Sequence, residues 1–185
     1  MVAHARAGIR THNMFLFEPT LESMGKWWRQ LVGESLGKEK NTSGNVVHEG
    51  IIPVVSVGST DLHSVGQLYI GGPRTIATTF VTVGGGDVRV PQGGIAEALT
   101  PGLTGKSFEE IMGAIAEGTK RAYRAHRLPL VSIHLASLSP QALGVYMQSQ
   151  MIATMIAGRT LKVNPFDQPS VEQYKEETRR ILEGR

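Results

Sequence analysis

The sequence predicts an α/β fold, a three-layer α/β/α sandwich with a mostly parallel sheet, followed by a C-terminal helix. Apolar segments typical of strands alternate along the chain with segments whose apolar residues recur at helical spacing. The strand segments are continuous apolar and β-branched runs, as expected of parallel strands that are covered on both faces. Ligands of such sheets bind beyond the carboxyl ends of the strands, so we expect a site there.

The first strand is predicted at residues 14–17, and Pro19 opens the helix that follows it. The apolar residues of that helix fall at helical spacing: Leu21, Met24, Trp28, Leu31 and Val32. A strand followed by an amphipathic helix is the pairing that an α/β fold requires.

The next two strands are predicted at residues 51–57 and 75–83, both rich in β-branched residues. Between them, Thr60 or Asp61 caps a helix that we expect to continue to Tyr69 before a Gly-Gly-Pro stop.

A loop-rich insertion follows at residues 84–105. Its glycines lack the spacing of a dinucleotide-binding or P-loop motif, so phosphate binding is not predicted there. Ser107 and Glu110 then predict a capping box at the start of a surface helix, and residues 130–135 form another strand of the buried type.

The following helix begins at Pro140, carries no charge at residues 141–157, and is predicted to end at Gly158. An uncharged helix of this length should be central or lie against a partner chain. Three methionines recur along it at every fourth position and are expected to fill a core or an interface: Met147, Met151 and Met155. We divide the chain into an N-terminal arm at 1–13, a domain at 14–163 and a C-terminal turn and helix at 164–185.

Composition narrows the functional classes. The 185 residues suit one domain, or a domain with an arm. The 19 Lys and Arg exceed the 16 Asp and Glu only slightly and form no tract, so no nucleic-acid partner is expected. Cysteine is absent, which excludes disulfides, thiolate catalysis and Cys-ligated zinc. With no secretory signal or membrane-spanning run visible, we expect a cytoplasmic protein without a membrane partner.

The sequence NPFDQPSVEQYKEETRR, residues 164–180, combines a proline-rich turn with a helix start. The prolines disfavour helix immediately before them, and Ser170 with Gln173 predicts a capping box. A plain helix start accounts for these residues but leaves Gln168 in the turn and Lys175 in the helix unexplained. We therefore also consider that both side chains point into one cleft.

His63 follows the strand at 51–57 in the sequence VGSTDLHS. In the first turn of a helix the dipole disfavours the imidazolium, and a neutral ring can accept or donate protons. The alternative is a histidine that only helps to cap the helix. The six histidines form no HxxxH or HxH pattern, so no metal is expected.

Glu34 lies between Gly33 and Ser35, just after the apolar stripe of its helix ends. A carboxylate at the mouth of an apolar cleft is suited to abstract a carbon-bound proton near neutral pH. A solvated surface carboxylate is the alternative.

Three motifs, WWRQLVGES, STDLHSVGQ and NPFDQPSVEQYK, occur in this order and at separations that resemble the C-terminal sugar-isomerase (SIS) domain of bacterial-type glucose-6-phosphate isomerase. The resemblance extends from about Phe15 to the C-terminus. NPFDQP followed by a lysine is a specific signature of that family rather than a generic turn. The resemblance implies an SIS domain with the flavodoxin-like arrangement.

The resemblance also implies the role of each site residue. Glu34 would be the base that moves a proton between C1 and C2 of the open-chain sugar through a cis-enediol. His63 would assist ring opening from the neighbouring subunit of a homodimer, Lys175 would act with it on the ring oxygen, and Gln168 would line the pocket. The substrate would be a sugar phosphate, and neither a redox cofactor nor a metal is implied.

Two parts of the family's site are not in this chain. The family enzyme has an earlier SIS domain with a Ser/Thr-rich loop for the substrate phosphate, and a Gly-Arg segment whose arginine steadies the enediolate. We therefore expect isomerisation only together with an N-terminal SIS partner. The alternatives are a non-catalytic SIS module that binds phosphosugars, and an isomerase that also accepts mannose 6-phosphate.

Overall fold

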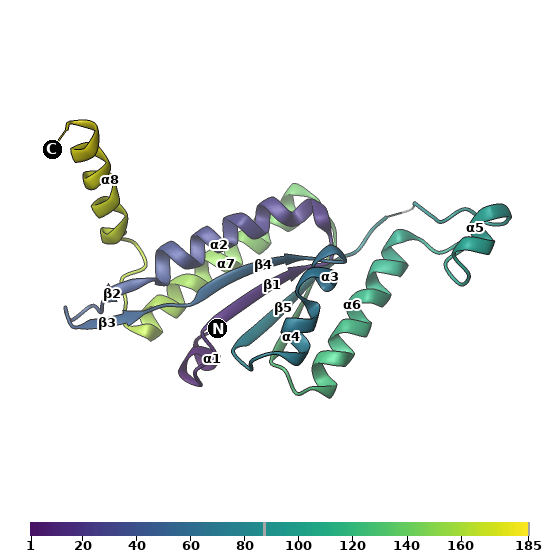
Figure 1. Ribbon diagram of the computed structural model, residues 1–185, viewed down its shortest axis with the longest axis horizontal. Coiled ribbons are helices and arrows are strands. Elements are labelled where there is room, and N and C mark those ends of the chain that lie inside the picture. The colour runs from purple at the N-terminus through teal and green to yellow at the C-terminus, as the bar shows by residue number, and fades with distance from the viewer. Residues whose placement is uncertain (87, 185) are drawn as a thin grey trace.

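A parallel four-stranded sheet forms the centre of the computed structural model, which describes residues 1–86 and 88–184 (Figure 1). Every neighbouring pair of strands in this sheet is parallel. The order across the sheet is β4 (Ile52–Val57), β1 (Thr11–Leu16), β5 (Ile76–Val83) and β6 (Leu130–Leu135). In chain order this is 2-1-3-4, which matches the flavodoxin-like arrangement.

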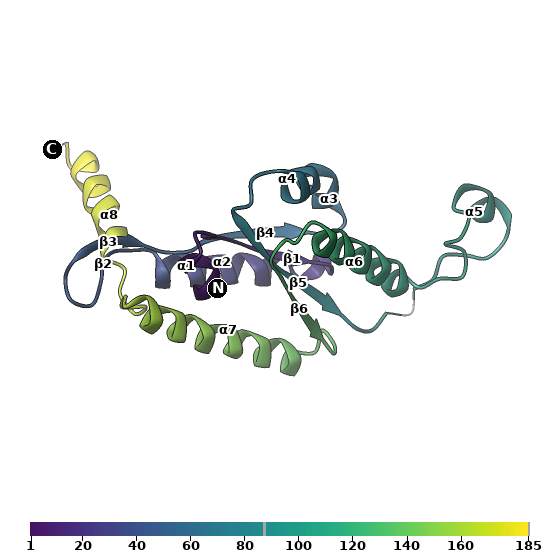
Figure 2. The same ribbon diagram turned by 90° about the horizontal axis from the view of Figure 1, so that it is seen from below.

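Helices cover both faces of the sheet, so the predicted three-layer α/β/α sandwich is confirmed (Figure 2). One face packs against α1 (Val2–Arg6), α2 (Glu22–Leu36) and α7 (Pro140–Leu161). The other packs against α3 (Thr60–Ser64), α4 (Gly66–Gly71) and α6 (Phe108–Ala125).

The central strand β1 contributes side chains to the hydrophobic cores on both faces of the sheet. Met14 and Leu16 belong to the core beneath α2, whereas Phe15 belongs to the core beneath α6. Alternate side chains of a strand point to opposite faces, and both faces are covered here, so β1 must be apolar throughout this stretch. This burial is the physical reason for the continuous apolar run in the sequence.

The N-terminal residues are part of the domain rather than an arm. Ala5 of α1 is buried in the core, and β1 begins at Thr11, three residues before the predicted strand. Thr11 is paired with strands on both sides, opposite Ile52 and Ile76. Residues 11–13, with the sequence THN, are more polar than is typical of a central strand. Only their pairing with two neighbouring strands shows that they belong to β1.

Two helix boundaries differ from the prediction. The helix expected from Thr60 to Tyr69 is two short helices, α3 and α4, separated at Val65. Helix α7 passes through Gly158 and ends at Leu161, and its C-cap Lys162 adopts the left-handed conformation with φ of 60°. Gly158 has a packing role instead, because a Cβ there would lie 3.1 Å from the ring of Pro165.

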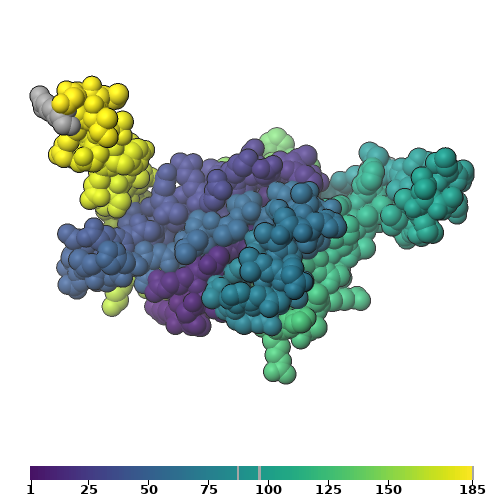
Figure 3. All heavy atoms as spheres, in the orientation of Figure 1, coloured from purple at the N-terminus to yellow at the C-terminus, as the bar shows by residue number. Residues whose placement is uncertain are grey.

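Helix α8 (Pro169–Leu182) begins one residue before the predicted cap. Gln168 is its N-cap and makes no side-chain capping bond, so the box predicted at Ser170 and Gln173 does not form. None of the helix's described residues is buried. Figures 1 and 3 show α8 standing away from the body of the molecule.

Helix α7, which is uncharged up to Gly158 and carries Arg159 in its last turn, is not central. Its inner face packs against α2, but its outer face is exposed, with Val145 at 73% and Ile156 at 62% relative exposure. Met151 and Met155 are also on the exposed side. The expectation of a central helix is therefore wrong, and the alternative of a helix that lies against a partner remains.

Other elements lie outside the main sheet. The short helix η1 (Pro19–Leu21) precedes α2, and an antiparallel hairpin of β2 (Lys38–Lys40) and β3 (Val46–Glu49) follows it. Helix α5 (Gly94–Leu99) lies within the predicted insertion and projects at the end opposite α8 (Figures 1 and 3). Asp87 of that insertion, and Arg185 at the end of the predicted C-terminal segment, lie outside the described residues.

Across residues 1–86 and 88–184, none of the helices combines the length and the hydropathy that crossing a bilayer requires.

Candidate functional site

Glu34 and Gln168 meet although 134 positions separate them in the chain. Glu34 lies in the last turn of α2, and Gln168 lies in the turn between α7 and α8. The Gln168 Nε2 donates a hydrogen bond to Glu34 Oε2 at 2.8 Å, and Gln30 Nε2 donates to Glu34 Oε1 at 3.2 Å. Glu34 and Gln168 line a cleft of about 210 Å³, whose other lining residues are Gly33, Gly37, Lys38, Pro169, Ser170 and Val171.

The turn that presents Gln168 is held by its own side chains. Asn164 Oδ1 accepts a hydrogen bond from the Phe166 backbone N–H at 3.1 Å, and Asn164 Nδ2 donates to Asp167 Oδ2 at 2.9 Å. Side chains that bond their own backbone in this way stabilise turns. The sequence NPFDQP therefore places an amide at a defined point facing the end of α2.

Lys38 connects the two halves of this cleft. Its side chain is only 4% exposed, and its Nζ donates to the backbone oxygen of Glu34 at 2.9 Å and to that of Asp167. The Nζ also lies 3.2 Å from the Asp167 carboxylate. Sequence reasoning missed Lys38, because lysine is almost always exposed and a single lysine after a helix carries no signal of burial.

The cleft lies at the amino end of the sheet. A Cβ on Gly33 would lie 3.8 Å from Pro53, which is near the start of β4. Helix α2 runs back from the carboxyl end of β1, so its last turn, with Glu34, reaches the opposite edge (Figure 1). Glu34 and Gln168 therefore lie away from the carboxyl ends of the strands, where the fold alone leads us to expect a ligand site.

His63 lies at the other edge of the sheet, in α3, with its side chain exposed. Asp61 supports this segment: its carboxylate accepts hydrogen bonds from the Val57 backbone N–H at 2.7 Å and from Ser64 Oγ at 2.8 Å. Strand β4 separates this edge from the Glu34 cleft by roughly 17 Å at the usual rise per residue. The structure therefore does not bring His63 to Glu34 within one chain.

Lys175 is also apart from the cleft. It lies about two turns into α8, and its Nζ donates to Glu172 Oε1 at 2.8 Å. This hydrogen bond and the Glu172 charge raise the pKa of Lys175 above its ordinary value. The described residues that line the Glu34 cleft do not include Lys175. Of the four predicted site residues, one chain brings together Glu34 and Gln168.

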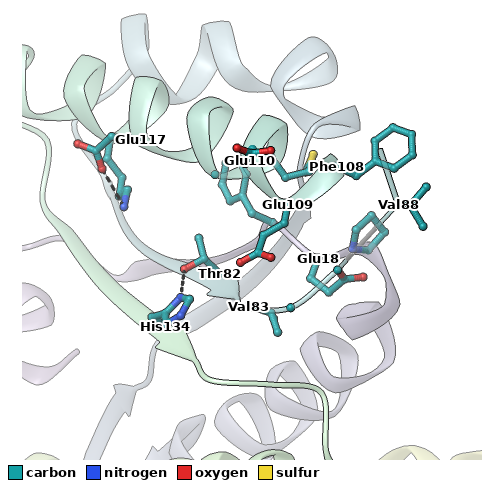
Figure 4. Close-up of a pocket in the computed structure, with 16 residues that line it drawn as sticks. Glu18, Thr82, Val83, Val88, Phe108, Glu109, Glu110, Glu117 and His134 are labelled. Atoms are coloured by element: carbon teal, nitrogen blue, oxygen red, sulfur yellow. Dashed lines mark hydrogen bonds and ion pairs between the residues drawn. The ribbon is translucent and has the colours of Figure 1, made fainter. Parts of the chain in front are cut away.

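A separate cavity of about 650 Å³ occupies the carboxyl ends of β1, β5 and β6 (Figure 4). Thr82 Oγ1 and His134 Nδ1 are 3.0 Å apart on its floor, and several carboxylates line it: Glu18, Glu109, Glu110 and Glu117. The ammonium of Lys120, 3.0 Å away, lowers the pKa of Glu117 most, and together with hydrogen bonds from Arg124 and Arg121 it brings this pKa to about 2. These carboxylates disfavour a phosphate dianion, and none of the four predicted site residues lines the cavity.

The fold and the cleft define a parallel α/β protein in which an acid and an amide from distant segments form a small site at the end of a helix. The family model for phosphoglucose isomerase matches residues 2–184, so the chain belongs to the phosphoglucose isomerase family.

Curated relatives agree with this family. The chain is 34% identical over 179 residues to the glucose-6-phosphate isomerase of Symbiobacterium thermophilum, covering 96% of this chain and 38% of the relative. It is 36% identical over 173 residues to that of Alkaliphilus metalliredigens, covering 92% of this chain and 36% of the relative. The chain thus spans somewhat more than a third of the length of these relatives.

Solved structures show the same fold. A hypothetical protein of Thermus thermophilus superposes with a TM-score of 0.87 at 32% identity, over 97% of this chain and 43% of that one. A glucose-6-phosphate isomerase of Chlamydia trachomatis superposes with a TM-score of 0.78 at 19% identity, over 95% of this chain and 35% of that one.

Proposed function

We propose that this chain is the C-terminal SIS portion of a glucose-6-phosphate isomerase, which interconverts glucose 6-phosphate and fructose 6-phosphate in cytoplasmic glycolysis and gluconeogenesis. The observation that carries the proposal is the hydrogen bond from Gln168 to the Glu34 carboxylate at 2.8 Å. It brings two of the family motifs into one cleft, and it holds an acid of the right type beside an amide that can bind sugar hydroxyls.

Isomerisation requires one carboxylate that reaches two adjacent carbons of the sugar, C1 and C2. Glu34 removes the C2 proton of the open-chain aldose as the C1 carbonyl oxygen gains a proton, which forms a cis-enediol. The enediol then loses the O2 proton while C1 receives a proton from Glu34, which forms the ketose. A positioned acid or base of this kind contributes about 10²- to 10⁴-fold to the rate.

Ring opening is assigned to His63 of the neighbouring subunit, acting with Lys175. Support for a homodimer comes from the fold, since His63 and the Glu34 cleft lie at opposite edges of the sheet in one chain. A second copy is therefore required if both groups are to act on one sugar. Helix α8 carries Lys175 and has no buried residue among those described, so it is available for such an assembly.

An N-terminal SIS portion would supply the groups that hold the phosphate and the enediolate. This chain spans 38% of the S. thermophilum relative, which leaves ample length for such a portion. The exposed apolar face of α7 is a surface that a partner of this kind would cover. Removing one electrostatic donor to a developing oxyanion costs about 10²- to 10³-fold in rate, so the chain alone should be nearly inactive.

The test is a coupled assay for fructose 6-phosphate formation, with the chain alone and mixed with the N-terminal portion of a curated relative. We expect turnover only in the mixture and its loss in Glu34→Gln. Glu22→Gln is the matched control: Glu22 is on the same helix, exposed, and paired only with Lys26 in the described structure. An inactive mixture, or a Glu34→Gln mixture as fast as wild type, would contradict the proposal.

A non-catalytic SIS module that binds phosphosugars is the second candidate, favoured by the positions of His63 and Lys175, neither of which is among the described residues that line the Glu34 cleft. It predicts sugar-phosphate binding by the mixture with no turnover. Mannose 6-phosphate, supplied to the same active mixture, decides whether the isomerase has one substrate pair or two.

A further inference from the structure

We infer that Lys38 is a positioning residue, which holds the Glu34 carboxylate and the Gln168 amide in the relative arrangement that catalysis needs. The inference rests on the proposed function of Glu34. In this scheme Lys38 does not contact the reacting carbons of the sugar. It acts through the two backbone segments that it joins, those of Glu34 and Asp167.

The first support is the burial of the Lys38 charge. Its side chain is 4% exposed, and moving an ammonium out of water is costly unless hydrogen bonds and an opposite charge compensate it. Here the ammonium donates hydrogen bonds to the backbone oxygens of Glu34 and Asp167, and it forms an ion pair with the Asp167 carboxylate at 3.2 Å. A buried cation with these partners has a defined position, unlike a mobile surface lysine.

The second support is the identity of those partners. One is the backbone of Glu34 itself, and the other is the backbone of Asp167, the residue directly before Gln168. The same two segments meet again through the side chains of Glu34 and Gln168. Lys38 therefore sets the separation of two backbones whose side chains form the site.

A third support is the way in which α2 ends. The last turn of a helix has backbone oxygens without helical partners, and Lys38 satisfies that of Glu34. Helix α2 thereby ends in a fixed position against the turn at Asp167 instead of fraying. A shift of about 1 Å at a reacting group can cost on the order of 10²-fold in rate, so such a fixed position matters for catalysis.

The inference is tested in the full chain by the ¹H–¹⁵N resonances of the Gln168 side-chain amide, assigned from their loss in Gln168→Leu. Lys38→Met keeps the length of the side chain and removes the ammonium. We expect the Gln168 amide resonances to shift and to exchange faster with solvent. Lys26→Met is the matched control on α2, because it removes an exposed ammonium that pairs with Glu22 at 2.8 Å. Unchanged Gln168 resonances in a folded Lys38→Met chain would overturn the inference.

The kinetic test uses the reconstituted mixture. Misplacement of the base should lower kcat of Lys38→Met by about 10- to 100-fold while KM changes less than about threefold. A merely structural tie would lower stability and leave kcat per folded molecule unchanged, and that result would also overturn the inference.

Lys38→Arg keeps the charge but replaces a compact ammonium with a planar, longer group. We expect Lys38→Arg to shift the Gln168 resonances as well. If Lys38→Met does not fold, Lys38→Arg becomes the test of the inference. Resonances identical to those of the wild type in Lys38→Arg would then overturn the inference. The two proposals fail separately. A wild-type mixture without turnover defeats the isomerase proposal, whereas an unmoved Gln168 amide defeats the role of Lys38.

Discussion

At the scale of single residues, His12 shows that burial sets the charge of a side chain. It lies in β1 and is 5% exposed, with its ring centroid 5.5 Å from that of His4. Burial lowers the pKa of His12 to about 4, with further contributions from the charges of the amino terminus and His4. The ring is therefore neutral in the folded protein near neutral pH.

This lowered pKa predicts a loss of stability in acid. The unfolded chain binds a proton at His12 near pH 6.5, whereas the folded chain binds one only near pH 4, so the stabilisation present above pH 6.5 declines as the pH falls towards 4. Urea unfolding at several pH values measures this decline. We expect a shallower decline in His12→Leu than in wild type, and an unaltered one in His126→Gln, which changes an exposed histidine. Equal slopes in His12→Leu and wild type would contradict the prediction.

The four predicted site residues show how far a sequence motif predicts the position of a single side chain. The resemblance implies that Glu34 and Gln168 belong to one pocket, and in the structure a hydrogen bond of 2.8 Å joins the two side chains. The roles of His63 and Lys175 stay predictions, because their positions in one chain neither join the cleft nor exclude delivery by a second copy. Lys38 escaped prediction because burial of a lysine depends on acceptors that come from a segment 129 positions away.

At the scale of elements, helix α2 positions the site because it lies close to the sheet. Gly25 makes this possible: a Cβ there would lie 2.6 Å from Val55 Cγ1 and 2.9 Å from Leu16 Cδ1. Such a contact is too short for well-packed atoms, so any larger residue pushes α2 away from β4.

We predict that Gly25→Ala lowers the free energy of unfolding by about 1–3 kcal/mol, the usual cost of overpacking a core. Gly118→Ala on α6 is the matched change, because a Cβ at Gly118 meets no atom within 4 Å. It should stabilise the protein by about 0.5–1 kcal/mol through the higher helix propensity of alanine. Denaturant unfolding measures both, and a Gly25→Ala chain as stable as Gly118→Ala would show that α2 can move without cost.

Some of the other helices and strands are predicted by residues close to them in the sequence, and others are not. The capping box of Ser107 and Glu110 forms as predicted, because all of its partners lie within four residues. The box predicted at Ser170 does not form, because the turn held by Asn164 lets α8 begin earlier, at Pro169. The hairpin of β2 and β3 was not predicted, because its two strands are only three and four residues long and pair outside the main sheet.

At the scale of the whole molecule, the position of His63 predicts a result for mixed dimers. If each site takes Glu34 from one copy and His63 from the other, then Glu34→Gln and His63→Asn chains complement each other. Random pairing makes about half of the dimers hybrid, each with one intact site of two, so an equimolar mixture should recover about a quarter of the wild-type rate. The measurement is the coupled assay with the N-terminal portion present. Activity no higher than that of either variant alone would show that both residues serve the same copy.

The exposed surfaces of α7 and α8 belong to the same scale. Exposed large apolar residues recur on both helices, namely Val145, Ile152 and Ile156 on α7 and Ile181 and Leu182 on α8. Exposed apolar residues that group in this way are typical of an interaction surface. The sequence shows that residues 141–157 of α7 carry no charge, but it does not show what covers them. The covering surface is expected to come from the N-terminal portion or from the second copy in the proposed assembly.

The sequence by itself determined the order and type of the four main strands, the two helical layers and the family motifs, because strand and helix periods and capping residues are read within a few positions. Only the tertiary structure decided that Glu34 and Gln168 meet at the amino end of the sheet, that Lys38 is buried between their backbones, and that His63 lies at the far edge. Those facts depend on contacts between segments more than a hundred residues apart, or on the direction in which a helix crosses the sheet. Local patterns carry neither kind of information.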